Sequence, residues 1–305
     1  MLEKNYIPIR NSQINYYKDV GLYYVENGSF VLYKPPGKSL ADLRLKEERH
    51  PPELYYQRKD RITAIKELQA GFNQHIFRSI KTGNVVAVKS TLCQLVEETL
   101  KEPRSGTLQA LPKTVDMLVS GYSKNPEIVK TIATISYKDY STVIHSVNVM
   151  ALTLGFCFYS KRSLRETQRL GLSALLNDFG KAEIPDDIQR APRMLTHDEI
   201  SVIKRHPKLG DFIIKVKSGI DGRIARGALE HHEKLDGSGY PKGTRHISFV
   251  GQLLGIIDCY EALTNEERPY RSAKSPLETL KVIKKDVEAG KFDRIIFEKF
   301  CYSLI

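Results

Sequence analysis

The chain has 305 residues, of which 41% are hydrophobic and 27% are charged, so it is long enough for one or two globular domains with a substantial core. It contains no run of about 18 apolar residues and no apolar secretory segment at its beginning, which predicts no transmembrane helix and a cytoplasmic location. Lys and Arg number 47 and Asp and Glu 36, a net charge of +11. This excess suits an anionic partner such as a nucleotide, and a generally basic surface explains it equally well.

Two residue patterns are absent. The four cysteines form no CxxC pair, so neither a disulfide framework nor a thiolate zinc site is expected. No Arg/Gly-rich or RNP-like segment points to nucleic acid, which is therefore not an expected partner.

Residues 1–60 differ from the rest of the chain. Segment 22–33 holds two β-prone runs around Asn27-Gly28, a pattern that predicts a hairpin. Ser39 is placed to cap a short polar helix, and residues 54–56 suggest a further strand. We interpret this stretch as a small α/β or β-rich module for regulation or interaction. Simple packing against its neighbour is the alternative, and the sequence does not separate the two.

Residues 61–105 are predicted to form a helical linker. Ile62, Ile65, Leu68 and Phe72 fall at helical spacing, and a second helical stretch, 84–102, follows a break at Gly83. Residues 103–106 then predict a loop and a domain boundary.

Residues 106–305 predict an all-helical domain, which makes the fold mainly α. Apolar residues at positions 147, 150, 151 and 154, and again at 250, 253, 254 and 257, recur with the spacing of amphipathic helices. No alternating strand pattern interrupts them.

Histidine and carboxylate residues stand at unusual places in this helical region. Asp178 follows an apolar run, and Asp258 shares the apolar face of its helix, so both carboxylates need a compensating charge. His206 precedes Pro207 at a predicted helix junction, and the adjacent His231 and His232 point about 100° apart on a helix. Each feature alone has a purely structural explanation.

Together, however, these residues and His145 predict a metal site in the core of a helix bundle. Imidazole and carboxylate ligands without thiolate suit iron, manganese or zinc. Two such ions clamp a phosphate and supply a hydroxide nucleophile for in-line attack. Lys181 is placed to neutralise the charge of the phosphate.

The order of these motifs resembles the HD superfamily of phosphohydrolases. HHEKLDGSGYP (231–241), DCYEAL (258–263) and RPYR (268–271) closely resemble the HD-GYP branch. The resemblance covers residues 120–305 and implies an all-helical fold, a centre of divalent ions, most often iron or manganese, and hydrolysis of cyclic di-GMP to pGpG or GMP. The metal ligands it implies are His145, Asp178, His206, His231, His232 and Asp258.

The resemblance also implies individual roles. Asp178 bridges two ions, and Lys181 lies at the scissile phosphate or the attacking water, so these two residues carry the catalysis. Arg271 and Lys274 match basic positions that contact the substrate. The loop Gly239, Tyr240 and Pro241 is associated in the family with substrate access and with partners such as GGDEF cyclases.

Three positions depart from the family pattern. Asn177 replaces the histidine of the HD pair, so a neutral and weaker ligand stands there. Ser141 stands where members with a third ion have a glutamate, which favours two ions. Glu261 replaces an aspartate and conserves its charge.

Three functions compete. The retained ligands favour an active cyclic di-GMP phosphodiesterase, whereas Asn177 favours a weakly active or inactive cyclic di-GMP receptor or scaffold that acts through protein partners. A hydrolase of another phosphate ester is disfavoured by the GYP loop and RPYR. The predicted linker helix is compatible with a homodimer without requiring one.

Overall fold

The computed structural model describes residues 5–9, 11–40, 42–43, 50–101, 111–123, 127–135, 141–189, 191, 193–217, 220–264 and 273–305. The elements of the N-terminal part are β1 (Tyr6–Ile9), η2 (Asn11–Tyr16), β2 (Leu22–Glu26), β3 (Ser29–Lys34), β4 (Leu54–Gln57), η4 (Arg58–Asp60), α1 (Arg61–Lys81) and α2 (Val85–Lys101). They are followed by α3 (Leu111–Tyr122), α4 (Glu127–Thr134), α5 (Thr142–Tyr159), α6 (Leu164–Leu175), η6 (Phe179–Glu183), α7 (Asp186–Gln189), α8 (His197–Ile203), α9 (His206–Phe212), η7 (Ile213–Lys217), α10 (Ala225–Glu230), α11 (Phe249–Thr264), α12 (Pro276–Glu288) and α13 (Arg294–Ser303).

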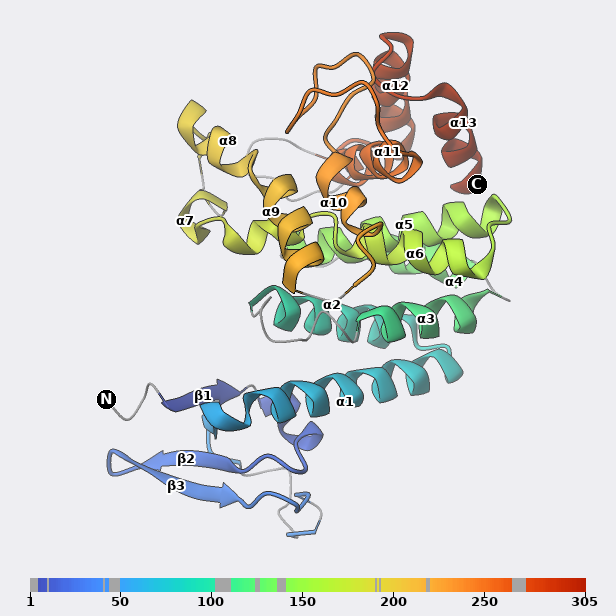
Figure 1. Ribbon diagram of the computed structural model, residues 1–305. Helices are drawn as coiled ribbons and strands as arrows, with labels where there is room; N and C mark the ends of the chain where they lie inside the picture. Colours follow the sequence, from blue (N-terminus) through green and yellow to red (C-terminus); the bar gives the residue numbers. More distant parts are fainter. Residues whose placement is uncertain are drawn as a thin grey trace.

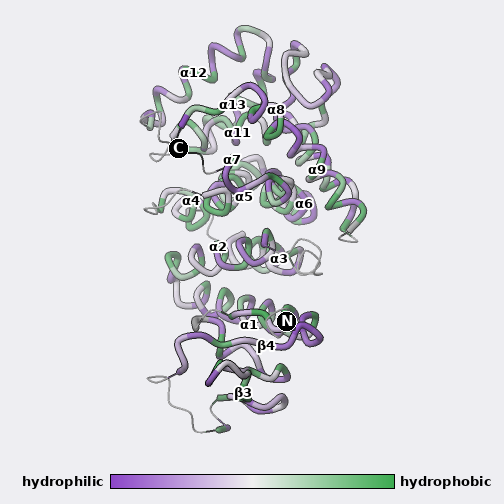
Figure 2. Tube along the Cα trace, turned by 90° about the vertical axis from the view of Figure 1, so that its left-hand side faces the viewer, coloured by the Kyte–Doolittle hydropathy of each residue, from purple (hydrophilic) through white to green (hydrophobic). Residues whose placement is uncertain are grey.

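The elements are stacked in layers that follow the order of the chain (Figure 1). The sheet and α1 lie at one end, α2 and α3 form the next layer, and α4, α5 and α6 the layer after it. Helices α9 to α11 cover that layer, and α12 and α13 lie at the far end (Figure 2). The predicted mainly α fold with a small N-terminal β-rich part is confirmed, and within the described residues no strand follows β4.

The four strands form one antiparallel sheet in the order β1-β4-β2-β3. Asn27 and Gly28 both have positive φ, 51° and 75°, which is the backbone of a tight two-residue hairpin turn. The predicted hairpin and the strand at residues 54–56 are confirmed, whereas β1 was not predicted. Its four residues include Pro8, and they are too few to show a pattern.

The helical stretches predicted on both sides of Gly83 are confirmed as α1 and α2, and Gly83 has a φ of +68° between them. The proposed boundaries at 60 and 105 stay predictions. Among the described residues, a cluster of buried hydrophobic side chains extends from Ile14 in the N-terminal part to Phe300 on α13. The amide of Asp42 donates to the hydroxyl of Ser39 (3.1 Å), but the rest of the helix expected there and the 103–106 loop lie outside the described residues.

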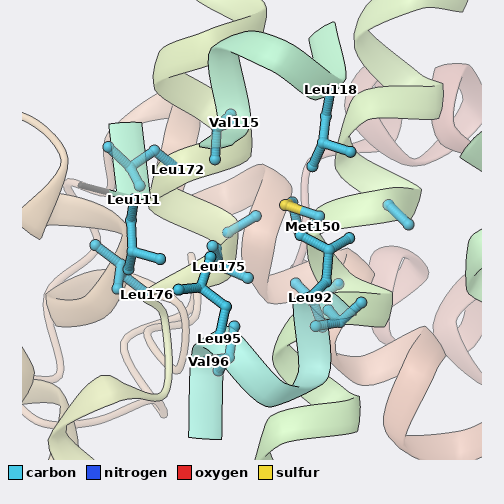
Figure 3. Packing of buried hydrophobic residues seen from close by; sticks show 14 of the residues in the cluster. Leu92, Leu95, Val96, Leu111, Val115, Leu118, Met150, Leu172, Leu175 and Leu176 are labelled. Atoms are coloured by element: carbon cyan, nitrogen blue, oxygen red, sulfur yellow. The ribbon is translucent and has the colours of Figure 1, made fainter. Parts of the chain in front are cut away.

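The layer of α2 and α3 packs on the layer of α5 and α6 through large aliphatic side chains (Figure 3). Leu92 and Leu95 of α2 and Leu118 of α3 meet Met150 of α5 and Leu175 of α6, and all five are buried. Burial of this kind is the main favourable contribution to folding. It also fixes α5 and α6, whose ends carry the site described below.

Helix α5 is long and apolar enough to cross a membrane by length and composition alone, but 67% of its apolar window is buried inside the fold. Because α4, α6 and α11 pack around it, we assign it as a core helix.

A substitution at Phe72 tests how strongly the packing of α1 against the N-terminal part stabilises the fold. Its ring is fully buried on α1 and packs against Tyr16, with ring centroids 5.2 Å apart. We expect Phe72→Ala to lower the free energy of unfolding by about 3–5 kcal/mol, measured by urea denaturation. Phe77→Ala on the same helix is the control, because Phe77 is 47% exposed and should change stability by about 0.5 kcal/mol or less. Equal effects of the two substitutions would contradict the assigned packing.

Candidate metal centre

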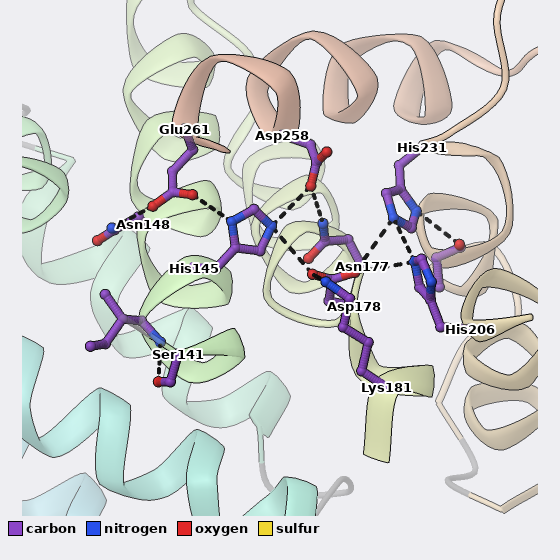
Figure 4. A network of polar contacts seen from close by, with 12 residues as sticks. Ser141, His145, Asn148, Asn177, Asp178, Lys181, His206, His231, Asp258 and Glu261 are labelled. Carbon is purple, nitrogen blue, oxygen red and sulfur yellow. Dashed lines mark hydrogen bonds and ion pairs between the residues drawn. The ribbon is translucent and has the colours of Figure 1, made fainter. Parts of the chain in front are cut away.

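The six residues predicted as ligands come from five segments and meet in one place (Figure 4). His145 lies on α5, His206 begins α9, and Asp258 lies on α11. Asp178 lies between α6 and η6, and the pair 231–232 directly follows α10. The predicted helix junction at His206 is confirmed, because α8 ends at Ile203 and Pro207 occupies the first turn of α9.

The candidate ligand atoms form two groups that share Asp178. One group is Asp178, His206, His231 and His232, the other is His145, Asp178 and Asp258, and within each the ligand atoms lie within 4.8 Å of one another. Because both groups contain the same carboxylate, the arrangement suits two neighbouring cations better than one.

The two oxygens of Asp178 face different sides of the centre. Its Oδ1 lies 3.2 Å from His206 Nε2 and 3.7 Å from His231 Nε2. Its Oδ2 lies 3.3 Å from His145 Nε2 and 2.6 Å from Lys181 Nζ. Burial alone would raise the pKa of this carboxyl, but Lys181 and the surrounding imidazoles outweigh burial and hold its pKa well below the usual value. Asp178 is therefore an anion that is paired with Lys181 and surrounded by imidazole nitrogens.

A close backbone approach brings Asp178 to His206. A Cβ on Gly180 would lie 1.9 Å from the backbone oxygen of His206 and 2.5 Å from the backbone nitrogen of Gly210. No side chain fits there, so only glycine allows η6 to touch α9. This contact sets the distance between Asp178 and His206 in the first group.

Two of the histidines are held through their outer ring nitrogens. His206 Nδ1 lies 2.7 Å from the carbonyl oxygen of Ile203, and His231 Nδ1 lies 2.9 Å from that of Ala228. A carbonyl oxygen only accepts, so Nδ1 carries the hydrogen and Nε2 is turned toward Asp178. Burial lowers the pKa of His206, and burial together with His231 lowers that of His232 well below the usual value. His206 and His232 are thus neutral imidazoles, the form that binds metal ions.

His145 is held between carboxylates. Its Nδ1 lies 2.5 Å from Glu261 Oε2 and its Nε2 lies 2.9 Å from Asp258 Oδ1. Burial would lower the pKa of His145, but Glu261 and Asp258 together raise it to about 10. A cation that takes Nε2 as a ligand would therefore replace a proton there.

Asn177 lies fully buried beside this second group. Its Nδ2 donates to Asp258 Oδ1 over 3.3 Å, whereas its Oδ1 is buried with no hydrogen-bond partner. A buried acceptor without a partner costs free energy unless a cation or donor satisfies it. The donor set of imidazole, carboxylate and amide oxygen therefore fits divalent metal ions.

The GYP loop folds against the centre. The ring of Tyr240 stacks on His232 at 4.6 Å between centroids, and a Cβ on Gly239 would meet the backbone of residues 233 and 234 at about 2.5 Å or less. The carboxylate of Glu233 accepts from the amides of Lys242 (2.7 Å) and Thr244 (3.1 Å) and so fixes the loop. The loop is part of the wall of the centre.

The remaining predicted positions have different outcomes. The amide of Lys274 donates to the Leu263 carbonyl (3.0 Å), which places this residue between α11 and α12. Arg271 and the rest of RPYR lie outside the described residues. Ser141 caps α5, and its hydroxyl accepts from the amide of Ile144 (3.4 Å).

Sequence reasoning missed two residues that support the centre. Asn148 donates to Glu261 over 2.7 Å, and the buried Lys89 of α2 donates to Asn148 over 2.7 Å. Neither belongs to a motif. The helical spacing of three residues between His145 and Asn148 was the one available signal.

Comparison with known families decides the identity. A family model described as HD domain matches residues 125–296, more than half of the chain. The matched region contains both donor groups, the GYP loop and the DCYEAL motif. The chain belongs to the HD-GYP family.

Several curated proteins are similar to this HD-GYP chain. The cyclic di-GMP phosphodiesterase PA4108 of Pseudomonas aeruginosa is 29% identical over 188 residues, 61% of this chain and 45% of that protein. The cyclic di-GMP phosphodiesterase response regulator RpfG of Xanthomonas campestris is 31% identical over 68% of this chain and 55% of its own length. A 3'3'-cGAMP-specific phosphodiesterase of Vibrio cholerae is 30% identical over 53% of this chain and 37% of its own. The chain spans about half the length of the first two of these relatives.

A solved structure shares the whole arrangement. Bd1817 of Bdellovibrio bacteriovorus, described as a HDG"Y"P protein, superposes with a TM-score of 0.65 over 97% of this chain and 98% of its own at 20% identity. This likeness includes the N-terminal part and supports the HD-type helical fold.

Gly180 provides a test of how the centre is assembled. We expect Gly180→Ala to push η6 away from α9, to weaken divalent metal binding at least about tenfold and to cost about 1–3 kcal/mol of stability. Isothermal titration with Mn²⁺ and urea denaturation measure the two effects. Gly155→Ala on α5 is the matched control, because a Cβ there meets nothing within 4 Å. Unchanged metal binding in a folded Gly180→Ala protein would show that this contact does not set the site.

Proposed function

We propose that this HD-GYP protein is a metal-dependent cyclic di-GMP phosphodiesterase that gives pGpG, GMP or both. The main support for this proposal is the buried Asp178 carboxylate, whose two oxygens face two separate groups of candidate metal ligands. The names of the two relatives from Pseudomonas aeruginosa and Xanthomonas campestris support the substrate.

The donor groups suggest how two ions would be held. His206, His231, His232 and one oxygen of Asp178 would bind the first ion. His145, Asp258 and the other oxygen of Asp178 would bind the second, with Asn177 as an additional weak ligand. When bound, such ions supply Lewis-acid stabilisation of phosphate charge and lower the pKa of water. Iron or manganese fits this donor set.

Besides the metal ions, the side chain of Lys181 is proposed to supply a positive charge for catalysis. Its ammonium lies 2.6 Å from Asp178 Oδ2 and its side chain is 26% exposed, so it is held by the centre and still reaches solvent. A phosphate that enters from that side would take up one of its remaining donors. Arg271 and Lys274 are proposed to contact the rest of the substrate.

Asn177 favours one alternative function. Its amide is a neutral ligand where the family motif has a histidine, so the second ion would be held less tightly. A weakly active or inactive cyclic di-GMP receptor would follow from that loss. In that case the loop around Tyr240 is the proposed contact for protein partners such as GGDEF cyclases.

Turnover of cyclic di-GMP by the full chain tests the proposal. The protein is loaded anaerobically with Fe²⁺ or Mn²⁺, and the products are separated by chromatography, with 3'3'-cGAMP as the competing substrate. We expect pGpG or GMP, abolished by chelator. Asp178→Ala is the negative control, because it removes the shared carboxylate and should lose metal and activity together. Full metal content in that variant would contradict the proposed centre, and absence of product from folded, metal-loaded wild type would favour the receptor.

Asn177→His tests the assignment of the weak ligand. An imidazole at this position should raise the affinity for the more weakly held ion by roughly an order of magnitude, equivalent to about 1.4 kcal/mol. Isothermal titration with Mn²⁺ and the rate of cyclic di-GMP turnover measure the change. If neither the affinity nor the rate responds, residue 177 does not contact an ion.

A further inference from the structure

A buried lysine outside the centre reaches toward it from α2. The side chain of Lys89 has no exposed surface, and its Nζ donates to Asn148 Oδ1 over 2.7 Å and to the carbonyl of Ile135 over 2.6 Å. Burial lowers its pKa to about 8, with Cys93 and Glu261 acting in the opposite direction. The group is thus predominantly an ammonium at neutral pH. Burying a charge is costly, and these hydrogen bonds compensate for that cost.

A chain of hydrogen bonds continues from Lys89 to a proposed metal ligand. Asn148 Nδ2 donates to Glu261 Oε1 over 2.7 Å, and Glu261 Oε2 lies 2.5 Å from His145 Nδ1. The Nε2 of the same ring faces Asp258 and Asp178. Four side chains from α2, α5 and α11 therefore connect in series (Figure 4 shows the last three).

The chemistry of an ammonium makes this series directional. Lys89 donates and cannot accept, so the oxygen of Asn148 must face it and the NH₂ group must face Glu261. Glu261 then receives one N–H from Asn148 and offers its other oxygen to His145. Without the lysine, the Asn148 oxygen loses this donor, and the bond to Glu261 alone is left to hold the orientation of the amide.

We propose that Lys89 is a positioning residue for the metal centre: through Asn148 and Glu261 it keeps the hydrogen of His145 on Nδ1 and directs Nε2 to the second ion. This inference rests on the proposed two-ion centre. Outer partners of metal-binding histidines commonly change metal affinity by about 10–100-fold when removed. The effect should be confined to the ion held by His145, Asp178 and Asp258.

Binding of Mn²⁺ to the full chain tests the proposal. Wild-type protein should bind two ions by isothermal titration and give the electron paramagnetic resonance signal of a coupled pair. In Lys89→Met we expect the first affinity to be unchanged, the second to fall by about tenfold or more, and an isolated Mn²⁺ signal at intermediate metal concentrations. Thr91→Val is the matched control, because Thr91 is buried on the same helix and its hydroxyl bonds the Ala87 carbonyl (2.7 Å).

A second variant separates positioning from damage to the fold. Lys89→Met combined with Asn148→Leu replaces both members of the Lys89–Asn148 hydrogen bond by apolar groups, which avoids an unpaired Asn148 oxygen and takes from Glu261 only the Asn148 donor. If the residues act in series, the double variant loses no more second-ion affinity than Lys89→Met alone. Additive losses, or two unchanged affinities in Lys89→Met, would overturn the proposal. Failure of wild-type protein to bind two ions would instead overturn the two-ion centre itself.

Discussion

The burial of one carboxylate, that of Asp178, constrains the organisation of the whole helical region. A buried anion is tolerated only with compensating partners, and here they come from α5, α9, η6 and the residue that directly follows α10. These elements must keep their relative positions, or the carboxylate is left unpaired. The same requirement makes the site a good host for cations, since an ion between the imidazoles and Asp178 would satisfy both.

Close contacts at glycines meet this requirement. Gly180 lets η6 touch α9, and Gly227 lies where a Cβ would be 2.8 Å from a methyl group of Leu254, so α10 sits tightly on α11. Such contacts leave little room for adjustment, because protein interiors are close-packed. The aliphatic layer between α2–α3 and α5–α6 then holds the helices that carry His145 and lead into Asp178.

Helix α2 connects the N-terminal part with the surroundings of the metal centre. Near its C-terminal end Glu98 accepts from Gln13 of the N-terminal part over 2.7 Å, and nearer its start Lys89 enters the hydrogen-bond series to His145. A stretch that the sequence describes only as a linker is therefore built into the core on both sides. Its apolar residues Val88, Leu92, Leu95 and Val96 belong to the same hydrophobic cluster as residues of the N-terminal part and of the later helices.

The sequence by itself determined the helical class, the hairpin at Asn27-Gly28, the family and the residues that gather around Asp178. It could do so because local periodicity, turn chemistry and short motifs are properties of neighbouring positions. Only the tertiary structure decided which oxygen of Asp178 faces which histidine, that Asn177 keeps an unpaired acceptor, and that Lys89 belongs to the surroundings of the centre. The Lys89–Asn148 and Asn148–Glu261 contacts join residues 59 and 113 positions apart, and no local pattern encodes a hydrogen bond over such a separation.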